Sequence, residues 1–468
     1  MASLSQRNLS RILEEATRTG GDFAELFWED KEEANITWSS GGVKSVTGVR
    51  TVGVGIYLLK GVKSVYVCTN DLALPALLEA AKRAAELLAA GGCSGAGVAP
   101  RPFQALVLTH PNPIRITPSA APMPDKIQLL REMELGIADT QGLRQLDLGY
   151  FESDQRVTVA NTDGLFAEDR RTACRLRMTA AMEREGKVLS RWQDFTRPQG
   201  FEAFDDREAP VAFAKDFLGR MALSLKAEPI RSCTVPVVLD AGSCGTIWHE
   251  SCGHPLEAAA VAAGASEFCG RLGEKVAADK VTLVDDGTLP GLYGSEAMDD
   301  EGCPTKRNVL IEKGVLKGYL CDRLGGRKLG MPSTGSGRRQ DYTYAPVSRM
   351  TNTFLAPGED DEEEMIASVD EGLFVTGCGG GCGGREFSIE VTEGWWIKNG
   401  RLVHPVSGLT LNGRGLEVIK LVDRVGGKLV SEGGGFCGAS SGLVPTTSFQ
   451  PRIRISAMAI GGTAGQEG

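Results

Sequence analysis

Histidine is scarce in this sequence, and the features of a membrane or secreted protein are missing. Only four histidines occur among 468 residues. No apolar run is long enough to cross a bilayer. The first residues lack the basic segment and the continuous apolar stretch that a secretory signal requires. These absences predict a cytoplasmic protein that does not enter a membrane.

Disulfide frameworks, structural zinc motifs and positive net charge are also lacking. Twelve cysteines are spread from Cys68 to Cys437 without paired CxxC motifs, so a zinc ribbon or finger is not indicated. In a chain without a secretory signal, we expect them to be reduced thiols or metal ligands. The formal net charge of −9 argues against nucleic-acid binding, because an extended phosphate interface depends on clustered Lys and Arg.

The length and composition are those of a globular protein with two domains. Hydrophobic residues make up 42% of the chain and charged residues 24%, and 468 residues exceed a typical single domain. We place the boundary in the segment 226–232, which contains Pro229. The predicted fold class is α+β, with an N-terminal helix and strand domain (1–228) and a C-terminal strand-rich domain (229–468).

Hydrophobic periodicity and turn residues predict the elements of both domains. In the N-terminal domain we expect helices at residues 5–19, 74–90, 125–135 and 207–224, and strands at 34–38, 52–59, 62–67, 156–160 and 172–182. In the C-terminal domain we expect strands at 233–239 and 452–458, hairpins at 309–320 and 395–403, and a helix at 416–425.

Two of the four histidines flank a glutamate in the stretch HESCGH, residues 249–254. Neutral imidazoles are zinc ligands, and a carboxylate beside a metal-bound water can act as general base in a hydrolase. His249, Glu250 and His254 are therefore candidate site residues. The alternative is a chance grouping on a helix, since motif matches of six residues do occur by chance.

The spacing HExxxH is one residue longer than HExxH. On a regular α-helix, residues five apart point about 140° away from each other and cannot share one metal. One wide turn of the π type would bring both imidazoles back to one face. Gly253 is permissive and Pro255 lacks a backbone donor, so we predict a helix distortion around His254.

A catalytic zinc normally takes a third protein ligand. Cys437 is attractive because it lies in the glycine-rich stretch GGGFCGASSGLVP, where the backbone can approach another element closely. Glu257 could equally hydrogen-bond to a ligand or form a salt bridge. Spacing alone does not select among the candidates, which are Glu257, Cys252, Cys378, Cys382, His404 and Cys437.

Longer stretches in the C-terminal half resemble the TldD/PmbA family of zinc-dependent peptidases, and within it the metal-carrying TldD branch. The N-terminal half matches only loosely, through element order and the NTDG turn at 161–164. The cysteines of GCGGGCGG, residues 377–384, depart from the family pattern. The matching stretches are HESCGHPLEA (249–258), FCGRLGEKVAADKVTLVDDGT (268–288), DDEGCPTK (299–306), GSGRRQDYTYAPVSRMTNTF (335–354) and FCGASSGLVP (436–445).

The resemblance implies a function and a ligand set. It implies one Zn²⁺ per active subunit on His249, His254 and Cys437, with Glu250 as the catalytic base. It also implies cleavage of small or unfolded peptides, including modified peptide precursors. The family further implies a cytoplasmic dimer, either a homodimer or a heterodimer with a PmbA-like subunit without the metal motif. The N-terminal domain would help to form the dimer and the substrate cavity.

Several alternatives stay open at this point. Arg338 and Arg339 are candidates for binding a substrate carboxylate or an oxyanion, although they could pair with the domain's own acids. Cys378 and Cys382 could form a redox pair or an extra metal site, or be free thiols. A non-catalytic peptide-binding or maturation subunit with a structural zinc site is the alternative to the enzyme. Four protein ligands would favour that subunit, and three ligands plus water the enzyme.

Overall fold

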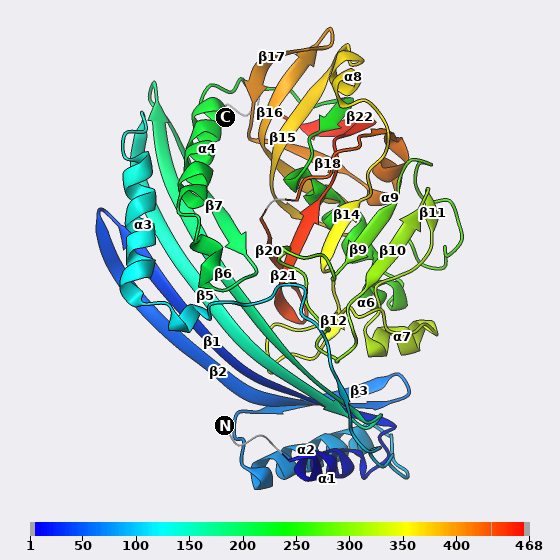
Figure 1. Cartoon of the computed structure of the whole chain (residues 1–468). Helices are drawn as coiled ribbons and strands as arrows, with labels where there is room; N and C mark the ends of the chain where they lie inside the picture. Colours follow the sequence, from blue (N-terminus) through cyan, green and yellow to red (C-terminus); the bar gives the residue numbers. More distant parts are fainter. Residues whose placement is uncertain (1–4, 432, 463–468) are drawn as a thin grey trace.

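A long, curved sheet forms most of the N-terminal half (Figure 1). The computed structural model describes residues 5–431 and 433–462. The strand order is β3-β2-β1-β5-β6; β7 pairs antiparallel and β4 parallel with β6. The strands are β1 (Phe23–Ser39), β2 (Gly42–Lys60), β3 (Lys63–Thr69), β4 (Gln104–Leu106), β5 (Leu143–Asn161), β6 (Leu165–Arg184) and β7 (Lys187–Arg197).

A pair of helices covers each end of this sheet (Figure 1). At one end, α1 (Gln6–Thr17) and α2 (Leu74–Ala90) bury apolar side chains against β1 and β2. At the other end, α3 (Met123–Ile137) and α4 (Glu208–Ser224) pack on β5 and β6. The four helices predicted from the periodicity of apolar residues are confirmed, because each places a buried stripe on the sheet.

The long strands were only partly predicted, because the buried face of β1 carries charges. β1 has 17 residues, and its buried side chains include Glu25 and Glu29. Glu25 accepts a hydrogen bond from Arg339 at 2.9 Å, and Glu29 accepts one from the backbone N–H of Tyr342 at 2.8 Å. Partners distant in sequence therefore stabilise a strand whose own residues resemble a solvated segment.

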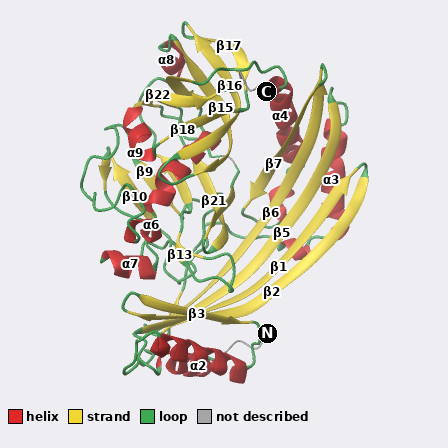
Figure 2. Ribbon diagram, turned by 180° about the vertical axis from the view of Figure 1, so that it is seen from behind, coloured by secondary structure: helices red, strands yellow, loops and turns green. Residues whose placement is uncertain are grey.

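Three sheets build the strand-rich C-terminal half, which lies beside the long sheet in both views (Figures 1 and 2). The first has the order β15-β8-β22-β18-β16-β17, with β19 paired to β22; the second has the order β11-β10-β9-β14-β21-β20; the third is the pair β12-β13. The strands of the first are β8 (Cys233–Leu239), β15 (Glu371–Cys382), β16 (Phe387–Lys398), β17 (Arg401–Val406), β18 (Leu409–Gly413), β19 (Val422–Val425) and β22 (Ile453–Gly461).

The second and third sheets consist mostly of short strands. They are β9 (Leu283–Asp286), β10 (Arg307–Glu312), β11 (Val315–Leu316), β12 (Gly337–Arg338), β13 (Val347–Ser348), β14 (Asn352–Leu355), β20 (Gly435–Ala439) and β21 (Gly442–Phe449). The helices of this half are α5 (Thr246–Trp248), α6 (Ala258–Ala262), α7 (Arg323–Leu329), α8 (Glu362–Ala367) and α9 (Gly415–Val418). No helix among the described residues is long and apolar enough to cross a membrane.

Most predicted elements of this half are confirmed, and one is wrong in part. The hairpin at 395–403 is β16 and β17, and it turns at Asn399 with φ 48°. The helix predicted at 416–425 ends early: after α9 and a 3-10 turn (Ile419–Leu421), residues 422–425 form β19. The buried side chains of Val422 and Val425 pair across to β22, and β-branched residues favour such a strand.

Candidate metal centre

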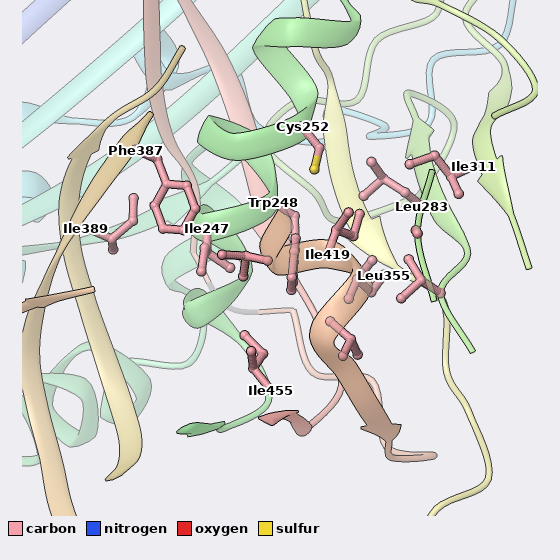
Figure 3. Packing of buried hydrophobic residues seen from close by; sticks show 14 of the residues in the cluster. Ile247, Trp248, Cys252, Leu283, Ile311, Leu355, Phe387, Ile389, Ile419 and Ile455 are labelled. Carbon is pink, nitrogen blue, oxygen red and sulfur yellow. The ribbon is translucent and has the colours of Figure 1, made fainter. Parts of the chain in front are cut away.

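The HESCGH stretch follows buried strand β8 and forms a wide helical turn. After α5, residues His249–Gly253 form a π-helical turn and His254–Leu256 a 3-10 turn. The backbone N–H of His254 donates to the carbonyl of His249, five residues earlier. The predicted distortion is therefore confirmed. Ile247, Trp248 and Cys252 point into the core around this turn and fix its orientation (Figure 3).

Gly253 is required for packing rather than for backbone freedom. Its φ of −58° is an ordinary helical value. A Cβ atom at this position would lie 2.0 Å from the Sδ atom of Met350, far inside van der Waals contact. Pro255 follows in the 3-10 turn, where its missing N–H leaves no helical bond unmade. Gly253 therefore allows the close approach of Met350, and Pro255 is compatible with the 3-10 turn that follows.

The turn brings both imidazoles to a cysteine more than 180 residues further along the chain. The Nε2 atoms of His249 and His254 lie 3.1 and 3.2 Å from the Sγ atom of Cys437 on β20. One nitrogen from each histidine and this sulfur all lie within 4.8 Å of one another. A tetrahedral zinc ion bound to them would need N–S separations of about 3.5 Å, so the group fits zinc after small movements.

Among the other third-ligand candidates, only Cys382 lies in the same pocket, and it is not part of the group of three donor atoms. Glu257 Oε2 accepts a hydrogen bond from His254 Nδ1 at 3.1 Å, on the opposite side of the ring from Cys437. Cys252 is buried beside Ser251, and His404 lies 3.8 Å from Glu228. Cys378 packs against the core. Within residues 5–431 and 433–462, no other group of three His, Cys, Asp or Glu side chains could hold a metal ion.

The proximity of these groups shifts their proton affinities. Burial alone would raise the pKa of Cys437, but hydrogen bonds with His249 and His254 lower it to about 4. Burial alone would lower the pKa of His254, but its hydrogen bonds with Cys437 and Glu257 raise it to about 10. The metal-free site therefore contains a thiolate beside an imidazolium. Burial also raises the pKa of Glu250, partly offset by the two histidines.

The three candidate ligands and Glu250 line one pocket of about 470 Å³. Its walls come from the end of β15 and the residue after it (Gly381, Cys382 and Gly383) and from β20 (Phe436, Cys437, Gly438 and Ala439). Cys382 is exposed in this pocket, although spacing alone could not place it there. A catalytic metal site needs a position open to water and substrate, and this pocket provides it.

The glycine-rich end of β15 lies directly on Glu250. A Cβ atom on Gly383 would lie 2.3 Å from the backbone oxygen of Glu250 and 2.7 Å from its Oε2 atom. Any larger residue at this position would displace either the loop or the carboxylate. The sequence contains a signal for this contact, since the run GCGGGCGG is unusually rich in glycine.

Arg338 and Arg339 do not line this pocket. Both residues are buried, with 1% and 4% of their surface exposed. Arg338 donates to Glu296 at 2.9 Å, and Arg339 donates to Glu25 of the N-terminal sheet at 2.9 Å. The expectation that they bind substrate is thus corrected by their burial: they pair with the protein's own acids, and Arg339 joins its two halves.

Sequence reasoning missed Arg349, which lies in the same family-like stretch. Its side chain is fully buried and donates to the backbone carbonyl of Cys437. It also lies near Glu257, the hydrogen-bond partner of His254. The stretch GSGRRQDYTYAPVSRMTNTF contains three arginines, and nothing in their spacing distinguishes Arg349 from the other two.

Two imidazoles, a thiolate and an adjacent carboxylate in an open pocket are the chemical groups of a metal-dependent hydrolase. Comparison with known protein families agrees with this class. Family models described as PmbA/TldA metallopeptidase domain 1, central domain and C-terminal domain match residues 24–88, 116–225 and 232–462. The chain belongs to this family of metallopeptidases, as its motifs predicted.

Individual relatives agree with this assignment. A protein named metalloprotease TldD homolog from Haemophilus influenzae is 30% identical, covering 99% of this chain and 97% of its own. A protein named zinc metalloprotease TldD homolog from Saccharolobus solfataricus is 26% identical over 56% of this chain and 58% of its own. The crystal structure of TldE from Thermococcus kodakarensis has the same fold, with a TM-score of 0.74 at 18% identity, covering 98% and 100% of the two chains.

Proposed function

We propose that this metallopeptidase is zinc-dependent, with His249, His254 and Cys437 as metal ligands and Glu250 as general base. The observation that carries the proposal is the convergence of these three donor atoms, from elements far apart in sequence, beside a carboxylate in an open pocket. Thiolate and imidazole donors together suit zinc. A zinc metalloprotease among the relatives supports the same metal.

The chain's own residues divide the work of peptide hydrolysis. Zinc, when bound, would supply a Lewis acid that polarises the scissile carbonyl and lowers the pKa of water. Glu250 would take a proton from the attacking water and return it to the leaving amine. Burial raises its pKa, which moves the carboxylate toward the range in which it can both accept and donate a proton. Glu257, accepting from His254 Nδ1, holds that ring with Nε2 toward Cys437.

Extended peptides are the proposed substrates. Among the described residues, β20 pairs only with β21, so its other edge carries backbone groups free to pair with a peptide. Its residues Gly438 and Ala439 line the pocket and are exposed. A peptide strand can add to such an edge through main-chain hydrogen bonds, which places it beside Cys437. A pocket of about 470 Å³ suits small or unfolded peptides rather than a folded domain.

A dimer is the proposed assembly, either of two copies or with a PmbA-like subunit. The structural similarity to a protein named TldE supports a fold shared with such a subunit. The β2 segment before its pairing with β3 exposes Val43, Val46 and Val49, an apolar edge suited to contact with another chain. Sedimentation velocity would show about twice the monomer mass for the homodimer; a monomer would require a different subunit.

The role of Glu250 can be tested with Glu250→Gln. The variant should retain zinc and lose at least about 100-fold in cleavage of a mixed unfolded-peptide pool, because general base catalysis contributes about 10²–10⁴-fold. Zinc content is measured by elemental analysis and cleavage by mass spectrometry. Glu363→Gln, on the exposed surface of α8, is the control. A zinc-loaded Glu250→Gln protein with full activity would contradict the proposal.

A further inference from the structure

Arg349 is buried between the two parts of the chain that supply the candidate ligands. It lies between β13 and β14, and its side chain has no exposed surface. A guanidinium can be buried at acceptable cost only when hydrogen bonds and an opposite charge offset its desolvation. The partners of Arg349 therefore indicate what the residue does.

On one side, Arg349 holds the hairpin formed by β20 and β21. Its Nη1 atom donates to the Oγ atom of Ser441 at 3.0 Å and to the carbonyl of Gly442 at 2.9 Å. Its Nη2 atom donates to the carbonyl of Cys437 itself. The planar guanidinium thus fixes the turn of the hairpin and the ligand-bearing residue at the same time.

On the other side, Arg349 faces Glu257. Its Nε atom lies 3.9 Å from the Oε1 atom of Glu257, and both atoms lack a hydrogen-bond partner among the described residues. The second carboxylate oxygen accepts from His254 Nδ1 at 3.1 Å. A buried path of contacts therefore runs from His254 through Glu257 and Arg349 to the backbone of Cys437.

We propose that Arg349 is a positioning residue for the metal centre, fixing Cys437 relative to the two histidines. The inference rests on the proposed function, in which these three residues bind zinc. Among the described residues, β20 is an edge strand with ladder bonds to β21 alone, so its own sheet restrains Cys437 from one side only. Metal sites require ligand positions held to within about 0.5 Å, and Arg349 supplies a further restraint through its hydrogen bond to the carbonyl of Cys437.

Arg338 provides a matched control. It is 1% exposed, donates to the carbonyl of Pro445 on β21 at 2.6 Å and to that of Met350 at 2.8 Å, and pairs with Glu296. It resembles Arg349 in burial, charge pairing and contact with the same hairpin. It contacts neither Cys437 nor Glu257. Substitution of Arg338 therefore reproduces the general destabilisation of the fold that follows from losing a buried arginine.

The test compares zinc binding by Arg349→Met and Arg338→Met in the full-length protein. Zinc dissociation constants are measured by competition with a chelator, and the thiolate-to-cobalt absorption band of the Co²⁺-loaded protein reports the bond to Cys437. Arg349→Met should bind zinc about 10–100-fold more weakly, as expected for loss of an outer partner of metal ligands. Its cobalt band should shift or weaken. Arg338→Met should retain wild-type affinity and the wild-type band.

Zinc affinity of Arg349→Met within twofold of wild type would overturn the inference. A loss of zinc affinity in Arg338→Met as large as that in Arg349→Met would also overturn it. If Arg349→Met does not fold, as judged by circular dichroism, Arg349→Lys replaces it, with Arg338→Lys as control. The lysine retains the charge but cannot reach all three acceptors, so we expect a smaller but measurable loss of affinity; an unchanged affinity would again overturn the inference. Failure of the wild type to bind zinc would instead overturn the proposed function.

Discussion

The contact between Gly383 and Glu250 predicts that Gly383→Ala impairs catalysis without removing the metal ligands. The new Cβ would lie 2.3 Å from the backbone oxygen of Glu250 and 2.7 Å from Oε2. Ordinary van der Waals contact begins at 3.4 Å. The loop or the glutamate must therefore move by about 1 Å. A misplacement of about 1 Å at a reacting group can lower the rate about 100-fold, which corresponds to a loss of about 2.7 kcal/mol in transition-state stabilisation.

The matched control is Gly380→Ala, three residues earlier, in β15. A Cβ at Gly380 would meet no atom within 4 Å, so this substitution adds the same methyl group without a clash. The assay measures kcat/KM for one cleaved peptide and the zinc content of each variant. Gly383→Ala should retain zinc and lose most of its activity, whereas Gly380→Ala should match wild type. Equal activity of the two variants would refute the steric argument.

Two further predictions concern the ligands. Cys437→Ser should lower zinc affinity at least about 100-fold in chelator competition, because a neutral hydroxyl replaces a thiolate; undiminished affinity would assign the third ligand elsewhere. Between about pH 7 and 9, zinc affinity should rise about tenfold per pH unit. In the metal-free site His254, with a pKa of about 10, binds a proton that zinc must displace. Cys437, with a pKa of about 4, has already lost its proton in this range. Calorimetry in buffers of different ionisation enthalpy would measure the released proton, and an affinity independent of pH would contradict the thiolate–imidazolium pair.

Local geometry at the HESCGH stretch could be predicted from the sequence. The five-residue spacing of His249 and His254 requires a wide turn if both face one metal, and the structure contains a π-helical turn there. The sequence suggested backbone freedom as the reason for glycine at position 253, but the structure gives a different reason. The backbone of Gly253 is ordinary, and the packing of Met350 against it excludes a side chain. That contact joins residues about a hundred positions apart, which periodicity and spacing do not describe.

Contacts between distant segments could not be predicted from local patterns. Cys437 was one of six third-ligand candidates by chemistry; its glycine-rich surroundings made it attractive, but only the family resemblance selected it. Arg338 and Arg349 are chemically identical residues in one short stretch, yet only Arg349 reaches the ligand strand at Cys437. The strand predicted at 34–38 missed the first part of β1, where the buried Glu25 accepts a hydrogen bond from Arg339 in the other half of the chain. In each of these examples, contacts with residues distant in sequence determine which groups the side chain binds.

X-ray absorption spectroscopy of the zinc-loaded protein distinguishes an open zinc site with three protein ligands from other arrangements. We expect one sulfur scatterer at about 2.3 Å, from Cys437, and three nitrogen or oxygen scatterers at about 2.0–2.1 Å, from His249, His254 and water. A second sulfur at bonding distance, such as that of Cys382, would indicate a closed structural site. A spectrum without sulfur would exclude Cys437 as a ligand. Either result would contradict the proposed site.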